Sequence, residues 1–372
     1  MRRSCFIMEL MTKNHHWRFI WWLLLVGGVV FTAAYYLALL SKSPTILLQS
    51  TLSPSPTPVV ATVLPDKNQP TVTHESSASP SILTTGDVML GRSVNYLGHK
   101  YQDYGWSLAK IAPFLQQFSY VVANLENPII KDCPLTNEGM IFCASEPAAT
   151  ALKKAHFNLL TLANNHINNY GESGLVQTKQ LLHQNGLDFV AEGELLSKNF
   201  ASHKFGFLAF DDVVTSLDEE EFFAQVAAAA AQVDVLFVSL HFGIEYQYQP
   251  TARQKQLAQG AIVAGADIIL GNHSHWFGPL EFYQHGVIIY SHGNFVFDQM
   301  WSEQTKQGLA IAWYFNQEAK LTQIKVYPIY ISNYGLANLA TDEAVGEQIL
   351  SKFIQVSALH ASASAGVITL DL

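Results

Sequence analysis

The chain has little positive charge for its length, and we find no internal repeats. Its 372 residues include 21 Lys and Arg against 30 Asp and Glu, which gives a net charge of −9. No basic stripe runs through the sequence, so the composition argues against nucleic acid as a partner. Charged residues make up only 14% and hydrophobic residues 49%, which suits one large domain with a filled core and an additional membrane segment.

Cysteine is also scarce, with three in the whole chain. Cys133 and Cys143 lie ten residues apart in "KDCPLTNEGMIFCASEP", with Pro and Gly between them. In an oxidising compartment this spacing suits a disulfide that closes a hairpin-like loop, and two free thiols are the alternative. A zinc pair is disfavoured because no further cysteine accompanies the two. We expect Cys5 to be cytoplasmic and unpaired.

Charge is absent from residues 19–40, "FIWWLLLVGGVVFTAAYYLALL". As a helix with about 1.5 Å rise per residue, this run spans a bilayer core of roughly 30 Å. Basic residues precede it (Arg2, Arg3, Lys13 and Arg18), whereas only Lys42 follows closely. The positive-inside rule therefore predicts a cytoplasmic N-terminus (1–18), a single-pass anchor in the cell membrane (19–40) and an extracytoplasmic remainder. A cleaved signal peptide is the alternative.

Residues 41–80 are rich in Ser, Thr and Pro, which predicts an extended linker. From Ser81 to the end of the chain, short apolar runs alternate with amphipathic stretches, so we predict an α/β domain over 81–372. Helices are expected at about 218–231 and 251–264, and another should begin with Ser173 as its cap and end at Gly186. Residues 306–333 look richer in strands.

Polar residues follow five of the predicted strands. They are Asp87, Asn124 and Glu126, Asn164 to His166, His241, and His273 with His275. Each alone has an ordinary explanation, as a turn residue, a loop amide or a core histidine. Ligands of open α/β sheets bind beyond the carboxyl ends of the strands, however, so five strand ends that carry such residues favour one shared site.

The residue types at these strand ends suit a divalent metal. Asp87 and Glu126 offer carboxylates and Asn165 an amide oxygen, and imidazole nitrogens come from His241, His273 and His275. This mixture favours Mn, Fe or Zn over calcium, which prefers oxygen alone. If the chain stays extended through Ser274, His273 and His275 point to the same side and face one centre, or one metal each.

An ordered set of motifs resembles the CapA-type capsule synthesis or poly-gamma-glutamate synthesis family. The motifs are "GDVMLGR", "NLENP", "ANNHINNYGESGL", "SLHFGIEY", "GADIILGNHSH" and "SHGNFVFD", and the resemblance covers about residues 81–335. That family is similar to calcineurin-like metallophosphoesterases. The resemblance implies a four-layer αββα metallophosphoesterase-like sandwich with a site for two divalent metal ions.

The resemblance also implies a role for each site residue. Asp87 and His275 would ligate the first metal, Glu126 would bridge both metals, and the second metal would be held by Asn165, His241 and His273. His166 would be the catalytic acid or an oxyanion donor. The chain departs from the pattern at Met89, where phosphoesterases have histidine, and at Asn169, where relatives often have Asp.

Three further residues near these motifs leave alternatives open. Arg92 suits a phosphate or carboxylate clamp in the catalytic site, because its guanidinium binds such groups bidentately, and a structural salt bridge is the alternative. We expect Asn294 to order the rim of the site. Glu245 follows His241 closely, but an exposed loop carboxylate is the simpler interpretation.

These expectations support three hypotheses about function. The first is a membrane-anchored, outward-facing metal-dependent phosphoesterase. The second follows the family: the domain assists synthesis, export or attachment of an anionic surface polymer such as poly-gamma-glutamate, together with membrane proteins that make it. The third is a non-enzymatic envelope protein that keeps a structural metal, and Met89 and Asn169 are its main support.

Overall fold

The computed structural model describes residues 80–341 and 343–372. The predicted cytoplasmic stretch 1–18, the anchor 19–40 and the linker up to residue 79 lie outside the described residues. Among the helices of the described part, none combines the length and the apolar character needed to cross a membrane.

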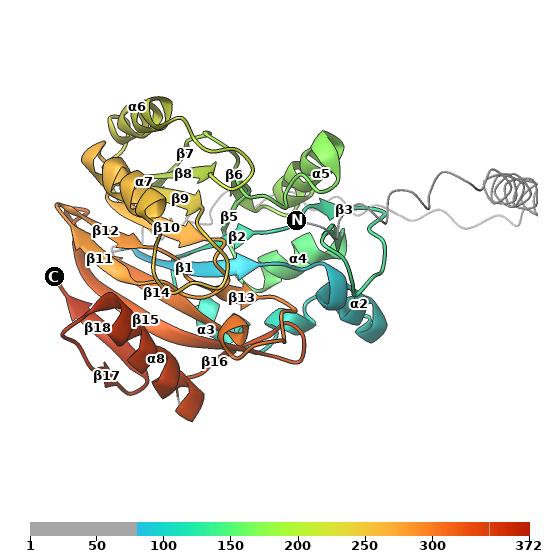
Figure 1. Ribbon diagram of the computed structural model, residues 1–372. Helices are drawn as coiled ribbons and strands as arrows, with labels where there is room; N and C mark the ends of the chain where they lie inside the picture. Colours follow the sequence, from blue (N-terminus) through green and yellow to red (C-terminus); the bar gives the residue numbers. More distant parts are fainter. Residues whose placement is uncertain (1–79, 342) are drawn as a thin grey trace, which may run out of the picture. The chain divides into compact units, whose positions relative to one another are not determined.

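The first sheet has ten strands, with β1 near its middle (Figure 1). On one side of β1 (Ser81–Val88) the parallel strands β2 (Tyr120–Leu125), β5 (Leu159–Thr161) and β6 (Asp188–Val190) follow in order. On the other side run the antiparallel strands β14 (Gln307–Phe315), β15 (Leu321–Ser332), β18 (Val367–Asp371) and β17 (Ala363–Ser364). The short strand β13 (Asn294–Val296) pairs in parallel with β1, and β16 (Leu336–Leu339) pairs with β15.

The second sheet has six strands in the order β11-β12-β10-β9-β8-β7. Its middle strands β12 (Gly286–Ile289), β10 (Ile268–Asn272), β9 (Val235–His241) and β8 (His203–Asp211) are parallel. The edge strands β11 (Leu280–Tyr283) and β7 (Leu196–Phe200) are antiparallel to them. A separate two-stranded sheet joins β3 (Ile129–Ile130) to β4 (Ala144–Ser145).

The two main sheets face each other across a common apolar core. Side chains alternate along β1, so Ile82 points toward the second sheet, where it joins Phe237 and Trp313, while Leu83 points away from it. The helix α8 (Ala344–Ser357) packs into the same core through Ile349, Leu350 and Phe353.

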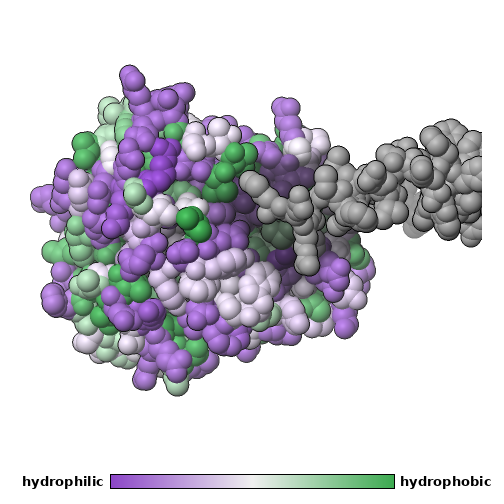
Figure 2. Space-filling view, viewed as in Figure 1, coloured by the Kyte–Doolittle hydropathy of each residue, from purple (hydrophilic) through white to green (hydrophobic). Residues whose placement is uncertain are grey.

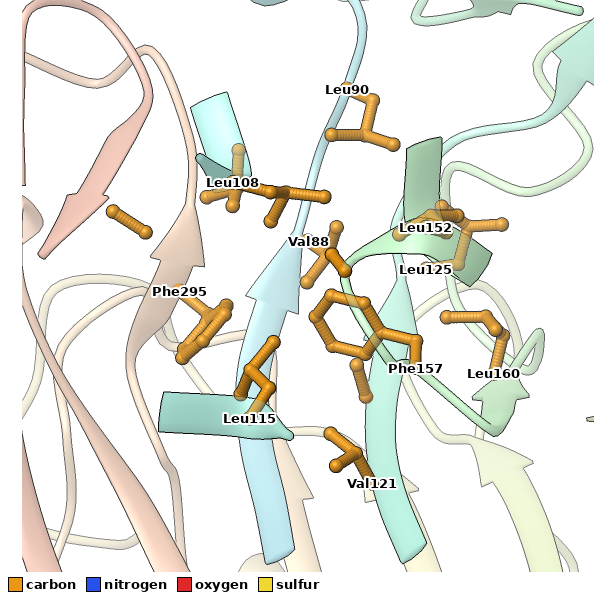
Figure 3. Packing of buried hydrophobic residues seen from close by; sticks show 14 of the residues in the cluster. Val88, Leu90, Leu108, Leu115, Val121, Leu125, Leu152, Phe157, Leu160 and Phe295 are labelled. Carbon is orange, nitrogen blue, oxygen red and sulfur yellow. The ribbon is translucent and has the colours of Figure 1, made fainter. Parts of the chain in front are cut away.

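Helices cover the outer faces of both sheets. On the first sheet they are α2 (Arg92–Tyr101), α3 (Ala112–Leu115), α4 (Pro147–Lys154) and α5 (Gly171–Gln184), with a 3₁₀ turn at Trp106–Leu108. Figure 3 shows Leu115 and Leu152 from these helices packed near Val88 and Val121 of the sheet. On the second sheet they are α6 (Glu219–Ala230) and α7 (Ala252–Val263). The mixed α/β fold predicted from the sequence is confirmed.

Two helix starts predicted from the sequence are confirmed, and one is wrong. Asp218 caps α6 by accepting the backbone N–H of Glu221 at 3.0 Å, and Thr251 begins a capping box on α7. The expected cap at Ser173 is wrong, because α5 begins at Gly171 and the Ser173 hydroxyl instead donates to the Tyr170 carbonyl at 3.3 Å.

Cys133 and Cys143 form a disulfide, with their Cα atoms 5.8 Å apart.

Hydrophilic residues occupy much of the face shown in Figure 2, and hydrophobic residues lie in small separate groups. Such scattered apolar residues are ordinary on a folded domain.

Candidate metal centre

The polar residues predicted from the strand ends meet at one edge of the sandwich. Asp87 lies near the end of β1, Glu126 directly follows β2, and His241 ends β9. The backbone N–H of His273, just beyond β10, donates to Asp87 Oδ2 at 3.3 Å, which joins the two sheets at this edge. The site therefore draws on both sheets.

Asp87, Glu126 and His275 form a buried cluster that could hold a metal ion. Their candidate ligand atoms all lie within 4.8 Å of one another. His275 Nε2 is 3.9 Å from Glu126 Oε1, and His275 Nδ1 is 3.4 Å from Asp87 Oδ2. Both carboxylate oxygens of Glu126 are buried without a hydrogen-bond partner. Such an unpaired buried carboxylate is costly, so the site fits a cation.

The two carboxyl groups of the cluster hold their protons very differently. Burial, followed by repulsion from Asp87, raises the pKa of Glu126 well above its usual range. Burial also tends to raise the pKa of Asp87, but the hydrogen bond from His275 and the nearby imidazoles of His241 and His275 outweigh it and lower this pKa to about 2. Without a metal, a proton shared by this pair would therefore favour Glu126, and a divalent cation would displace it.

A second group of predicted ligands lies beside this cluster. His241 Nε2 is 2.9 Å from Asn165 Oδ1, and the rings of His241 and His273 are 4.9 Å apart. His273 Nδ1 is buried and has no hydrogen-bond partner. Burial lowers the pKa of His241 well below its usual value and that of His273 to about 4. Both imidazoles are therefore neutral near pH 7, and the neutral form is the one that ligates metals.

The expectation of an extended segment through Ser274 is wrong. β10 ends at Asn272, and His273 and His275 adopt φ angles of 91° and 56°, in the left-handed region that is unusual for such residues. The turn is held by a hydrogen bond from the Tyr246 N–H to the Ser274 carbonyl at 2.8 Å. It separates the two histidine rings by 6.2 Å, with His273 beside His241 and His275 beside Glu126.

His166 lies beside this centre with one ring nitrogen held in place. Its Nδ1 is 3.2 Å from Asn169 Oδ1, and the same oxygen accepts the Phe142 backbone N–H at 2.7 Å. Asn169 therefore keeps the orienting contact expected of an Asp at that position. Burial, partly opposed by the Asn169 contact, lowers the pKa of His166.

Arg92 adopts the structural salt bridge that the sequence left open as an alternative. Its guanidinium pairs with the buried Asp298 and donates to the Gly139 carbonyl at 3.2 Å. It also lies over the Phe142 ring, 4.6 Å from the centroid. Its role as a clamp for a substrate anion stays a prediction.

The structure shows the surroundings of three further residues near the site. Met89 is fully buried in an apolar cluster with Phe142, Phe297 and Ile331. Asn124 had no predicted role, yet its amide donates to Asp87 Oδ1 at 2.8 Å. Glu245 is half-buried, and its charge raises the pKa of Glu126 and opposes the lowering at His273, so it is not simply a solvent-exposed loop residue.

Comparison with known proteins finds one matching family and several similar proteins. Residues 81–204 and 192–299 match the family described as "Bacterial capsule synthesis protein PGA_cap". The chain is 30% identical to "Capsule biosynthesis protein CapA" of Bacillus anthracis over 70% of this chain and 69% of that protein. It is 29% identical to "PGA biosynthesis protein CapA" of Bacillus subtilis (strain 168), over 77% and 81% of the two chains.

Among solved structures, a hypothetical protein from Thermus thermophilus aligns with a TM-score of 0.47 and 12% identity, over 68% of this chain and 100% of that one. The family match covers more than half of the chain, and the relative in Bacillus anthracis shares 30% of its residues over two thirds of both proteins. The chain thus belongs to the bacterial capsule synthesis (PGA_cap) family, which includes the CapA proteins.

Proposed function

We propose that this protein is a membrane-anchored CapA-like protein whose domain 81–372 acts outside the cytoplasm, in the synthesis, export or attachment of an anionic surface polymer such as poly-gamma-glutamate or capsule. Family membership and the names of its relatives support the role. The charge-free run 19–40 and the basic residues before it support the anchor and its orientation. The disulfide Cys133–Cys143 fits an oxidising compartment.

We further propose that the site binds two divalent ions, Mn, Fe or Zn, and has hydrolase-type chemistry on a phosphoester or on the polymer itself. The carrying observation is the buried, unpaired carboxylate of Glu126 within reach of Asp87 and His275. For the second ion, His241 Nε2 and Asn165 Oδ1, which lie 2.9 Å apart, would be two of the ligands. His273, with its free Nδ1, completes that set.

Divalent ions at such a site supply an activated water nucleophile and neutralise charge on a phosphoryl oxygen. The residues around the ions would position and transfer the proton. Asn169 fixes the Nδ1 side of His166, so its Nε2 is the nitrogen left to exchange a proton with the leaving group. Burial lowers the pKa of His166, and negative charge that develops beside the ring would favour its protonated form.

The test combines metal analysis with activity on the purified full chain. After reconstitution with Mn²⁺, Fe²⁺ or Zn²⁺, we expect bound metal and hydrolysis of a chromogenic phosphodiester. Asp87→Ala and His273→Ala should lose both, while His360→Ala, an exposed histidine, serves as the matched control. Unchanged metal content and activity in both site variants would contradict the assignment.

A deletion strain separates the cellular roles. Loss of surface polymer, restored by the wild-type gene and not by His273→Ala, is expected if the metal site serves polymer assembly. Normal polymer together with phosphodiesterase activity would instead favour a phosphoesterase that acts on another substrate.

A non-catalytic envelope protein with a structural metal is a second candidate, and Met89 favours it. The position where phosphoesterases carry a metal-binding histidine holds a fully buried methionine in an apolar cluster. Bound metal without turnover, together with polymer synthesis restored by a variant that retains metal but lacks His166, would support this candidate over the hydrolase.

A further inference from the structure

The orientation of the Asn294 side chain is determined by its surroundings. Asn294 begins β13, is fully buried, and pairs in register with Asp87 of β1. Its amide nitrogen donates to the Thr305 carbonyl at 2.8 Å and to Gln299 Oε1 at 3.1 Å. The carbonyl of Thr305 can only accept, so the amide nitrogen must face it. The Asn294 oxygen therefore faces the other way, toward the metal centre.

That oxygen meets one ring nitrogen of His275. Asn294 Oδ1 lies 3.0 Å from His275 Nδ1, and Asp87 Oδ2 lies 3.4 Å from the same nitrogen. Both neighbours accept hydrogen bonds, so Nδ1 must carry the hydrogen. The lone pair of neutral His275 is then on Nε2, which faces Glu126 Oε1 at 3.9 Å.

We propose that Asn294 is a positioning residue that holds His275 in the tautomer able to ligate a metal. A histidine that binds through Nε2 needs its hydrogen on Nδ1, and a partner for that hydrogen also fixes the plane of the ring. Asp87 cannot fill this role alone, because its carboxylate is itself a candidate ligand of the same ion. Phe297, in edge contact with the His275 ring at 4.8 Å between centroids, supports the ring without offering a polar partner.

This inference rests on the proposed metal centre, and Mn²⁺ binding to the full chain tests both. Asn294→Ala removes the acceptor, and we expect Mn²⁺ to bind about 10- to 100-fold more weakly, as is usual when the partner of a metal-bound histidine is lost. Asn294→Asp keeps the acceptor but loses both amide hydrogen bonds, and it should stay within a few-fold of wild type.

The comparison of these two variants separates positioning from ordinary packing. If Asn294 were only a structural residue, Asp would weaken Mn²⁺ binding as much as Ala, and that result would overturn the inference. Asn95→Ala is the matched control: Asn95 is also buried and accepts the Ser145 N–H at 2.9 Å, but it touches none of the proposed ligands. Unchanged affinity in Asn294→Ala would also overturn the inference.

A measurement on the metal-free chain tests the inference if no Mn²⁺ binds. If the wild-type chain binds no Mn²⁺, the proposed metal centre fails, and the tautomer can still be read from ¹⁵N chemical shifts of labelled histidines, with His275→Gln assigning the signal. Hydrogen on Nδ1 of His275 in the wild type but not in Asn294→Ala would uphold the role of Asn294. Hydrogen on Nε2 in the wild type, or on Nδ1 in both chains, would overturn it.

Discussion

The ring of Phe142 stacks on the ring of His166, with the two centroids 4.1 Å apart. Phe142 is the residue before Cys143, so the loop closed by the disulfide Cys133–Cys143 reaches directly to a residue of the site. The same loop supplies the Gly139 carbonyl to Arg92. A covalent link in the loop therefore supports the position of two predicted catalytic residues.

We expect the paired change Cys133→Ser with Cys143→Ser to lower the free energy of unfolding by about 3 kcal/mol, because the open loop gains entropy in the unfolded chain. Urea denaturation measures this change. Phosphodiesterase activity should also fall, since Phe142 and Gly139 lose their restraint. Cys5→Ser is the control, and a double variant as stable as that control would contradict the prediction.

The buried pair Arg92–Asp298 gives a second prediction. Asp298→Ala leaves the Arg92 guanidinium buried without its counter-ion, and we expect a loss of about 3–5 kcal/mol in the free energy of unfolding. The exposed pair Lys320–Glu318 is the matched control, and Glu318→Ala should cost less than about 1 kcal/mol. Similar costs for the two variants would show that Arg92 is satisfied without Asp298.

Asn169→Asp should raise the pKa of His166. A carboxylate at the position of Asn169 Oδ1, 3.2 Å from His166 Nδ1, stabilises the protonated imidazole, whereas the neutral amide does so only weakly. Histidine NMR titration should show the higher pKa, and the limb of the pH–rate profile that belongs to His166 should move to higher pH. Asn168→Asp, on the exposed neighbour, should move neither.

The raised pKa of Glu126 predicts that the stability of the metal-free chain depends on pH. Its pKa is raised in the folded state, so the folded chain holds more protons than the unfolded one above pH about 4.3. Stability contributed by this group is complete below that pH and is lost as the pH rises toward the folded pKa, at up to about 1.4 kcal/mol per pH unit.

Urea titrations between pH 5 and 8 in the presence of a chelator measure this loss. Glu126→Gln should reduce the slope, leaving the part that comes from other buried carboxyl groups such as Glu192, whose pKa burial raises to about 7. Glu318→Gln, an exposed carboxylate, should leave the slope unchanged. Saturating Mn²⁺ should also reduce the slope in the wild type, because the cation takes the place of the proton on Glu126. An identical slope in Glu126→Gln would mean that another group is responsible.

The strand ends could be predicted because they depend on local pattern. The apolar run that forms β9 ends at His241, and the run that forms β10 ends at Asn272, just where polar residues begin. The starts of the helices near Asp218 and Thr251 could be predicted for the same reason. Parallel strands then bring those ends to one edge, so the grouping of these strand-end residues could be predicted from the order of the strands.

The geometry inside the site could not be predicted in this way. The left-handed turn at His273 and His275 depends on a contact with Tyr246, and such φ angles in non-glycine residues have no local signal. The partner of Arg92 is Asp298, which is distant in sequence. Likewise, the contact between Asn294 and His275 joins two segments that tertiary pairing brings together, including β13 with β1 and Phe277 with His292.

The placement of the ligands on two sheets has a mechanical consequence. Asp87 and Glu126 belong to the first sheet, whereas His241 and His273 belong to the second. An ion bound by residues from both sheets would hold the two sheets together at this edge of the sandwich. The supply of metal would then govern how firmly the two sheets of this domain are joined at this edge.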